Sequence, residues 1–164
     1  MGFELTLRGT RRAPPRQGQN PFTGELELHA PLVMSATEHA AMLTVIGRHG
    51  GRLDDGGGGR VVLEKAALFF SGFDEEGGLV KVEGDLRLAC VVLFDLAEAG
   101  QLVVLPDLGD ALVTSRSALE RATALEDELG SPTIVVDDAE ALAAALSAEY
   151  ASAAAHTERA LRGT

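Results

Sequence analysis

One short pattern in the chain has residue types that could bind a metal ion. Glu25, Glu27 and His29 alternate along a predicted strand, so their side chains share one face and could offer oxygen and nitrogen ligands. Same-face side chains on a strand are about 7 Å apart, which is wide for three ligands to one ion. A solvated strand face gives the same pattern. We therefore predict no metal ion and no cofactor.

Two further patterns could support covalent or phosphate chemistry. Cys90 could act as a nucleophile if a basic neighbour and solvent exposure favoured its thiolate, but it lies within the apolar run 88–94. This setting predicts a buried thiol. The glycine run 56–59 is not followed by the Lys-Ser or Lys-Thr pair of a phosphate-binding loop, and we interpret it as a flexible connector.

Net charge excludes several classes of partner. The 164 residues include 14 Lys and Arg against 25 Asp and Glu, a net charge of −11. Such a charge repels nucleic acids and anionic lipid surfaces, so we expect neither nucleic acid nor a membrane as a partner. A single cysteine, an excess of arginine over lysine and the lack of a long apolar run predict a cytoplasmic bacterial protein.

The positive charge is concentrated near the N-terminus. Residues 1–16, here called the basic segment, carry four arginines and one glutamate, a net charge of +3 that leaves −14 for the rest. The arginines are Arg8, Arg11, Arg12 and Arg16. Pro14 and Pro15 predict an irregular, solvated loop. Alternatively, the basic segment folds onto the protein's own acidic body or grips an acidic ligand.

Acidic residues recur in short clusters that could face a basic partner. Each cluster has a simple structural explanation, but together they predict a negative binding surface. The residues that we assign to this surface are Asp74, Glu75, Glu76, Glu126, Asp127 and Glu128. Pairs at 54–55 and 137–138 have the same character, and none fits the pattern of a calcium-binding loop.

Hydrophobic periodicity predicts the strands. Residues 3–7 and 25–30 alternate, and the second alternation predicts that Leu26 and Leu28 point inward. An irregular segment separates these two strands. Further strands are predicted at 61–63, 67–70, 79–82, 102–105, 112–114 and 134–136.

Capping signals predict the helices. Ser35 with Glu38, Ser117 with Glu120 and Asp137 with Glu140 have the spacing of helix starts. Residues 86–99 could form a strand because of their β-branched run, but the helical spacing of their apolar residues favours a helix capped by Asp85. We expect residues 151–164 to extend the last helix into solvent or to fray.

The segment 20–25, Asn-Pro-Phe-Thr-Gly-Glu, resembles a turn found in a group of small bacterial proteins that have no established activity. These proteins also have segments similar to 99–106 and to the predicted strand and helix at 133–146. The resemblance implies one coherent domain and adds no chemistry. We expect Phe22 to anchor the turn on the core, with Gly24 giving the backbone freedom before the next strand.

We therefore predict a single α+β domain over residues 1–164, with a mixed, largely antiparallel sheet packed against three or four helices. Residues 1–24 would form its first strand and an irregular basic arm.

The function that these observations favour is non-catalytic binding, in the form of an immunity-like or antitoxin-like protein that neutralises a basic protein partner. The alternative is an accessory protein of a bacterial biosynthetic pathway, whose basic segment holds an acidic peptide or small molecule. A third hypothesis is an enzyme in which His29 or His39 meets Glu25 and Glu27 only after folding. No catalytic motif is present, so we predict that the protein is not an enzyme.

Overall fold

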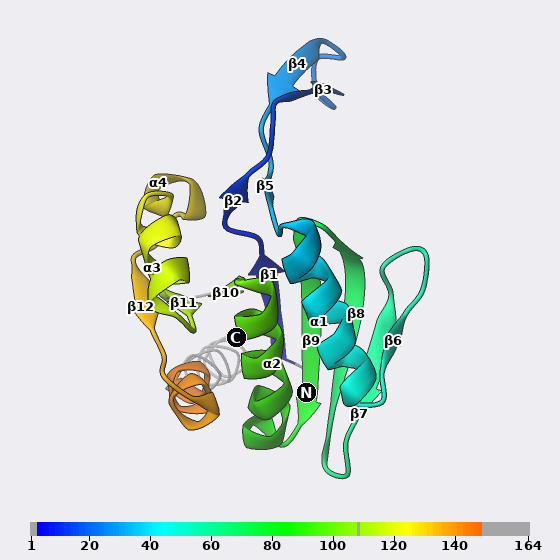
Figure 1. The fold of residues 1–164 in the computed structure, drawn as a ribbon, viewed down its shortest axis with the longest axis vertical. Coiled ribbons are helices and arrows are strands. Elements are labelled where there is room, and N and C mark those ends of the chain that lie inside the picture. Colours follow the sequence, from blue (N-terminus) through cyan, green and yellow to red (C-terminus); the bar gives the residue numbers. More distant parts are fainter. Residues whose placement is uncertain (1–2, 108, 149–164) are drawn as a thin grey trace, which may run out of the picture.

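The computed structural model describes residues 3–107 and 109–148, which form an α+β fold around one eight-stranded sheet (Figure 1). The order of the strands is β12-β11-β10-β1-β9-β8-β7-β6, and every neighbouring pair is antiparallel except β11 and β12. The strands are β1 (Phe3–Arg8), β6 (Arg52–Leu53), β7 (Gly59–Val62), β8 (Ala66–Asp74), β9 (Gly77–Gly84), β10 (Val103–Pro106), β11 (Ala111–Val113) and β12 (Thr133–Val135). The predicted mixed, largely antiparallel sheet is confirmed.

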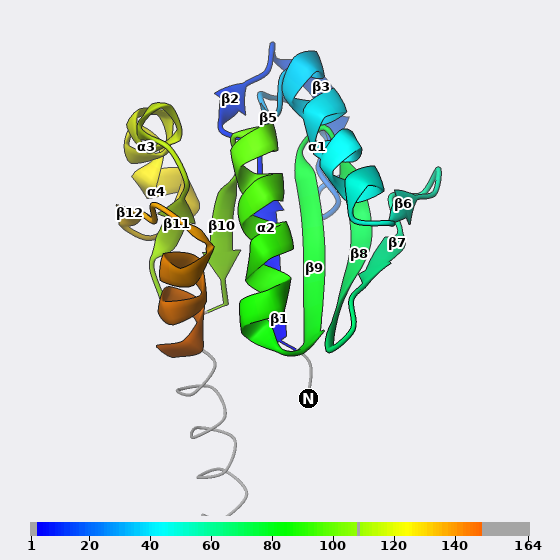
Figure 2. The ribbon, with the colours of Figure 1, turned by 60° about the horizontal axis from the view of Figure 1, so that its bottom comes forward.

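Two long helices cover one face of this sheet. Figures 1 and 2 show α1 (Ala36–Arg48) and α2 (Leu86–Gly100) side by side across it. The fully buried side chains of Leu5 and Leu7 on β1, Met42 on α1, and Leu93 and Leu96 on α2 belong to the main core between these layers. The alternation of β1 and the helical spacing in α1 and α2 therefore bury complementary faces.

A third layer covers only one end of the other face. There α3 (Arg116–Thr123) is followed by the single turn α4 (Glu126–Leu129). A further helix at 139–148 lies instead on the side of α1 and α2, because its Leu142, Ala143 and Leu146 belong to the main core. Ala118 and Ala122 of α3 pack with Val103, Ala111 and Val113 in a second, smaller core cluster. Since the strand neighbours Val104 and Leu112 join the main core, α3 must lie on the face opposite to α1 and α2.

Two of the four predicted helix starts are confirmed, and the other two are shifted. Ser35 and Glu38 form a complete capping box, and the predicted helix at 86–99 is α2, capped by Asp85. The cap of α3 is Ser115, whose side chain accepts from the amide of Ala118, so the predicted cap at Ser117 was wrong. The last helix is capped by Asp138, which accepts from the Ala141 amide, and not by Asp137. The expectation for 151–164 lies outside the described residues.

A ribbon inserted between β1 and α1 stands out from the body and is the largest departure from the prediction (Figure 1). It comprises residues 11–33 and is called the projecting arm below. Its strands are β2 (Arg11–Arg12), β3 (Arg16–Gln19), β4 (Leu26–His29) and β5 (Leu32–Val33). β2 pairs with β5, and β3 pairs with β4, both antiparallel. Residues 11–12 and 16–19 of the predicted irregular segment are therefore paired strand.

Three apolar side chains of the projecting arm that were predicted to point toward the core are exposed instead. Leu26 and Leu28 are 70% and 71% exposed, and Phe22 is 95% exposed. Their predicted burial was wrong because β4 pairs only with β3, and no second layer packs on either face of that hairpin within the described chain.

The glycine run is an ordered turn between β6 and β7, and its interpretation as a flexible connector was wrong. The Asp54 carboxylate accepts hydrogen bonds from the amides of Gly56 and Gly58, each at 2.9 Å. Gly57 is buried, donates to the Asp54 carbonyl and accepts from the Phe73 amide. Among the described residues, no helix has both the length and the apolar character needed to cross a bilayer.

Candidate functional site

The basic segment is held by the protein's own carboxylates. Arg11 binds Glu38 through two hydrogen bonds of 2.8 and 2.9 Å, and Arg16 pairs with Glu75 at 2.7 Å. Arg12 pairs with Glu128, which is 116 residues further along the chain. These contacts agree with the interpretation in which the segment folds onto the acidic body, and they disagree with a solvated loop.

These ion pairs place the two predicted acidic clusters on either side of the root of the projecting arm. Glu128 on α4 holds one side through Arg12, and Glu75 in the β8–β9 turn holds the other through Arg16. The turn is also tied to the residues that flank the arm, because the amides of Gly9 and Met34 donate to the carbonyls of Glu76 and Glu75. The two clusters therefore do not form one continuous binding surface.

The fold instead joins the 74–76 cluster to the acidic pair at 54–55. Both line a hollow of about 460 Å³ between α1 and the β6–β7 and β8–β9 turns, called the acidic groove below. Its five carboxylates belong to Asp54, Asp55, Asp74, Glu75 and Glu76.

Arg16 is the only lysine or arginine among the residues that line the acidic groove. His39 also lines it, and Leu43, Leu53 and Phe73 give it an apolar part. The pair at 54–55 was not among the residues assigned to the negative surface, although it directly precedes the glycine run. The Asp55-Gly56 pair is typical of a turn and is the sequence signal that could have placed these carboxylates there.

The groove suits an extended cation better than a bound metal ion. Within the described chain, no group of three or more His, Cys, Asp or Glu side chains could hold a metal ion. The hypothetical meeting of histidine and glutamate is also not seen for His39, which lies on α1 of the body, whereas Glu25 and Glu27 lie on the projecting arm. Glu27 accepts a hydrogen bond from the Asn20 amide group at 3.0 Å.

The second predicted cluster also contains Glu126 and Asp127, which lie on α4. Glu126 accepts from the Thr133 amide at 3.3 Å, which links α4 to β12. Asp127 is exposed on α4. Glu128 is bound to Arg12, whereas Glu126 and Asp127 make no ion pair within the described chain.

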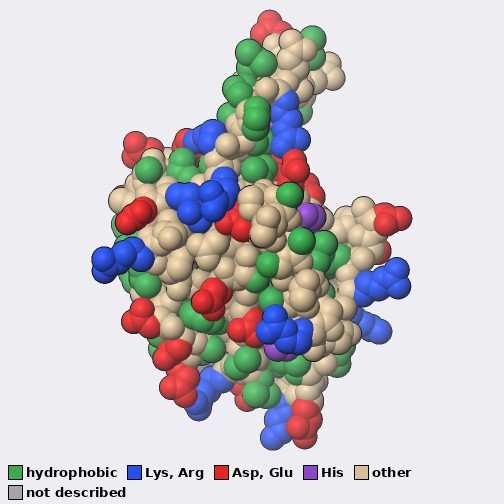
Figure 3. Space-filling view, in the orientation of Figure 1, with side chains coloured by type: hydrophobic (Ala, Val, Ile, Leu, Met, Phe, Trp, Pro, Cys, Tyr) green, Lys and Arg blue, Asp and Glu red, His purple; other side chains and the backbone are tan. Residues whose placement is uncertain are grey.

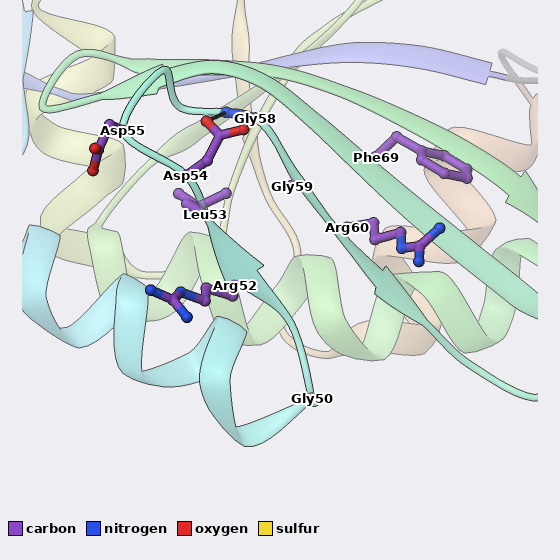
Figure 4. Close-up of a pocket in the computed structure, with 9 residues that line it drawn as sticks. All are labelled: Gly50, Arg52, Leu53, Asp54, Asp55, Gly58, Gly59, Arg60 and Phe69. Atoms are coloured by element: carbon purple, nitrogen blue, oxygen red, sulfur yellow. Dashed lines mark hydrogen bonds between the residues drawn. The ribbon is translucent and has the colours of Figure 1, made fainter.

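A larger hollow of about 760 Å³ lies beside the edge strand β6, but its polar groups do not converge (Figure 4). Arg52 and Arg60 are direct neighbours across β6 and β7, yet their guanidinium groups point in opposite directions. The Asp54 carboxylate faces the amides of its own turn. This hollow therefore offers no set of groups for binding one small ligand.

Cys90 is fully buried on α2, as predicted. Burial raises the pKa of its thiol to about 12, so almost no thiolate forms at neutral pH. We expect a disulfide reagent such as Ellman's reagent to leave the native protein unmodified at pH 8 and to react with one thiol per chain after denaturation in guanidinium chloride. Rapid reaction of the native protein would contradict this burial.

In comparisons with protein-family models, curated protein sequences and solved structures, no match to this chain was found.

Proposed function

We propose that the protein is a non-catalytic binding protein whose acidic groove takes a basic segment of a protein partner, in the manner of an immunity-like or antitoxin-like neutraliser. The observation that carries the proposal is the composition of the groove. Its five carboxylates and the single guanidinium of Arg16 leave a local net charge of −4 with His39 neutral, beside apolar surface from Leu43, Leu53 and Phe73.

The expected ligand follows from this composition. Lysine or arginine side chains would lie against the carboxylates, and an intervening apolar side chain would contact Leu43 and Phe73. The net charge of −11 would also attract a basic partner from a distance, so association should be faster at low salt.

The alternative, an accessory protein that holds an acidic ligand on the basic segment, has less support. Arg11, Arg12 and Arg16 already bind carboxylates of the protein itself, and an acidic ligand would have to displace those. Arg8 makes no ion pair within the described chain. It lies on β1 of the central sheet and not with the other three arginines in the projecting arm, so it would bind an acidic ligand without them.

The test compares two variants that remove the same amount of negative charge. Asp55→Asn with Glu76→Gln neutralises two exposed groove carboxylates that hold no described hydrogen bond, and Asp107→Asn with Asp127→Asn does so elsewhere on the surface. The probe is a fluorescein-labelled peptide that contains a Lys-Leu-Lys sequence. By fluorescence anisotropy at low salt, we expect roughly tenfold weaker binding for the groove variant and less than about threefold for the control.

Salt provides the second arm of this experiment. Raising ionic strength from about 20 mM to about 500 mM should weaken binding to the wild-type protein and reduce the difference between the two variants. Equal weakening in both variants would show that the peptide responds to overall charge and not to the groove, and would overturn the proposal.

A further inference from the structure

The tip of the projecting arm has an apolar face that nothing in the described chain covers (Figure 3). Residues 17–29 form this tip. Leu26 and Leu28 lie two residues apart on β4 and so share one face. Phe22 lies in the turn that joins β3 to β4. A lone two-stranded ribbon is at best marginally stable in water, so an ordered hairpin with this composition is expected to pack against something.

The charge of the tip limits what that surface can be. Residues 17–29 contain Glu25 and Glu27 and no lysine or arginine, which gives a net charge of −2. All the arginines of the projecting arm lie at its root, where each is bound to a carboxylate of the body. A matching surface should therefore be apolar with an excess of positive charge.

The outer face of the sheet, on the side away from α1 and α2, has this composition. The strand registers place Thr6 beside Leu79, Lys81 between Glu4 and Phe69, and Phe69 beside Arg60. Leu79 is 52% exposed, and no described helix covers this face over β1, β9, β8 and β7.

Charge distinguishes this outer face from the rest of the protein. Apart from Asp74, whose carboxylate accepts from the Glu76 amide in the β8–β9 turn and lines the acidic groove, its ionised side chains are Arg8, Arg60, Lys81, Glu4 and Glu83. Their net charge is +1 in a chain whose total is −11. Lys81 pairs with Glu83 at 3.3 Å, and Arg8 and Arg60 make no ion pair within the described residues.

We propose that two copies of this chain form a twofold dimer in which the arm tip of each copy packs its apolar face on the outer sheet face of the other. The occupant is a second copy because both halves of the contact are present in one chain, the described residues cover neither of them, and their charges are opposite. The projecting arm continues the long axis of the molecule (Figure 1), so an antiparallel pair brings each tip to the body of its partner. The contact uses none of the carboxylates of the acidic groove.

The test is a charge exchange between the two surfaces, followed by sedimentation equilibrium on the full chain. Leu26→Lys with Leu28→Lys places cations against the positive face, and Arg60→Glu with Lys81→Glu makes that face acidic toward the acidic tip. We expect wild-type protein at about 50 µM to sediment as a dimer of the 17.1 kDa chain and each double variant to sediment as a monomer. An equimolar mixture of the two variants should recover the dimer, because every contact in the mixed pair is either native or oppositely charged.

Leu88→Lys with Val91→Lys is the matched control, since both residues are exposed apolar side chains on α2 outside the proposed contact. This control should remain a dimer. The proposal is overturned if wild-type protein is monomeric over this range, if the Leu26/Leu28 variant still dimerises, or if the mixture stays monomeric. Peptide binding by the groove should be unchanged in the dimer variants. The experiment can therefore overturn the proposed dimer without overturning the proposed function of the groove, and the reverse.

Discussion

Gly57→Ala is expected to lower the free energy of unfolding by about 3 kcal/mol, although it adds one methyl group to a surface turn. Gly57 has φ +77°, in the left-handed region that side chains other than glycine adopt at a cost. A Cβ there would lie 2.3 Å from the carbonyl oxygen of Phe73 and 2.4 Å from its amide nitrogen. Both are backbone atoms of β8, so the turn or the strand must move. Urea denaturation followed by circular dichroism measures the loss.

The neighbouring glycine provides a matched control in the same turn. Gly56 lies outside the left-handed region, and a Cβ there would meet only the Asp54 carboxylate at 3.4 Å, an ordinary contact. Gly56→Ala should therefore change the free energy of unfolding by less than about 0.5 kcal/mol. If both substitutions have the same small effect, the turn does not pack on Phe73, and the acidic groove loses one of its fixed walls.

The glycine run also shows where sequence reasoning ends. Four adjacent glycines predict high conformational entropy, and the sequence contains no signal that Gly57 contacts Phe73, which follows it by sixteen residues in the chain. The helix starts are different because their signals are local. Ser35, Glu38 and Asp85 act within one turn of their own helix, and these predictions are confirmed.

The projecting arm was missed for a related reason. The alternation around Leu26 and Leu28 correctly indicates a strand with one apolar face. It does not say which layer, if any, lies against that face, because this depends on β4 leaving the body with β3 as its only partner strand in the part of the chain that the structure describes. Similarly, the excess of arginine in residues 1–16 indicated an attraction to acidic residues, but the pairing of Arg12 with Glu128 across 116 residues depends on the fold.

The second large effect is expected at Glu38, where two separate structural duties meet in one carboxylate. Its side chain accepts from the Ser35 amide to complete the capping box of α1, and it binds Arg11 at the root of the projecting arm. The Glu38 side chain is only 11% exposed. Glu38→Ala should lower the free energy of unfolding at pH 7 by about 2–3 kcal/mol, since it removes charge-assisted hydrogen bonds and half of a helix cap. Glu140→Ala breaks a pair with Arg87 that is exposed on both sides and should cost less than about 0.5 kcal/mol.

The pH dependence identifies the ionised carboxylate as the source of this stability. Burial by itself raises the pKa of Glu38. The hydrogen bonds from Arg11 and Ser35 and the charge of Arg11 lower the pKa, and together they outweigh burial, so the pKa in the folded protein lies below the ordinary value of 4.5. A lowered pKa stabilises the folded state fully above the unfolded value, and this contribution disappears as pH falls through the folded value. The difference between wild-type protein and Glu38→Ala should thus be constant from pH 6 to 8 and decrease below about pH 4.5. A difference that stayed constant down to pH 3 would assign the loss to packing of the side chain and not to its charge.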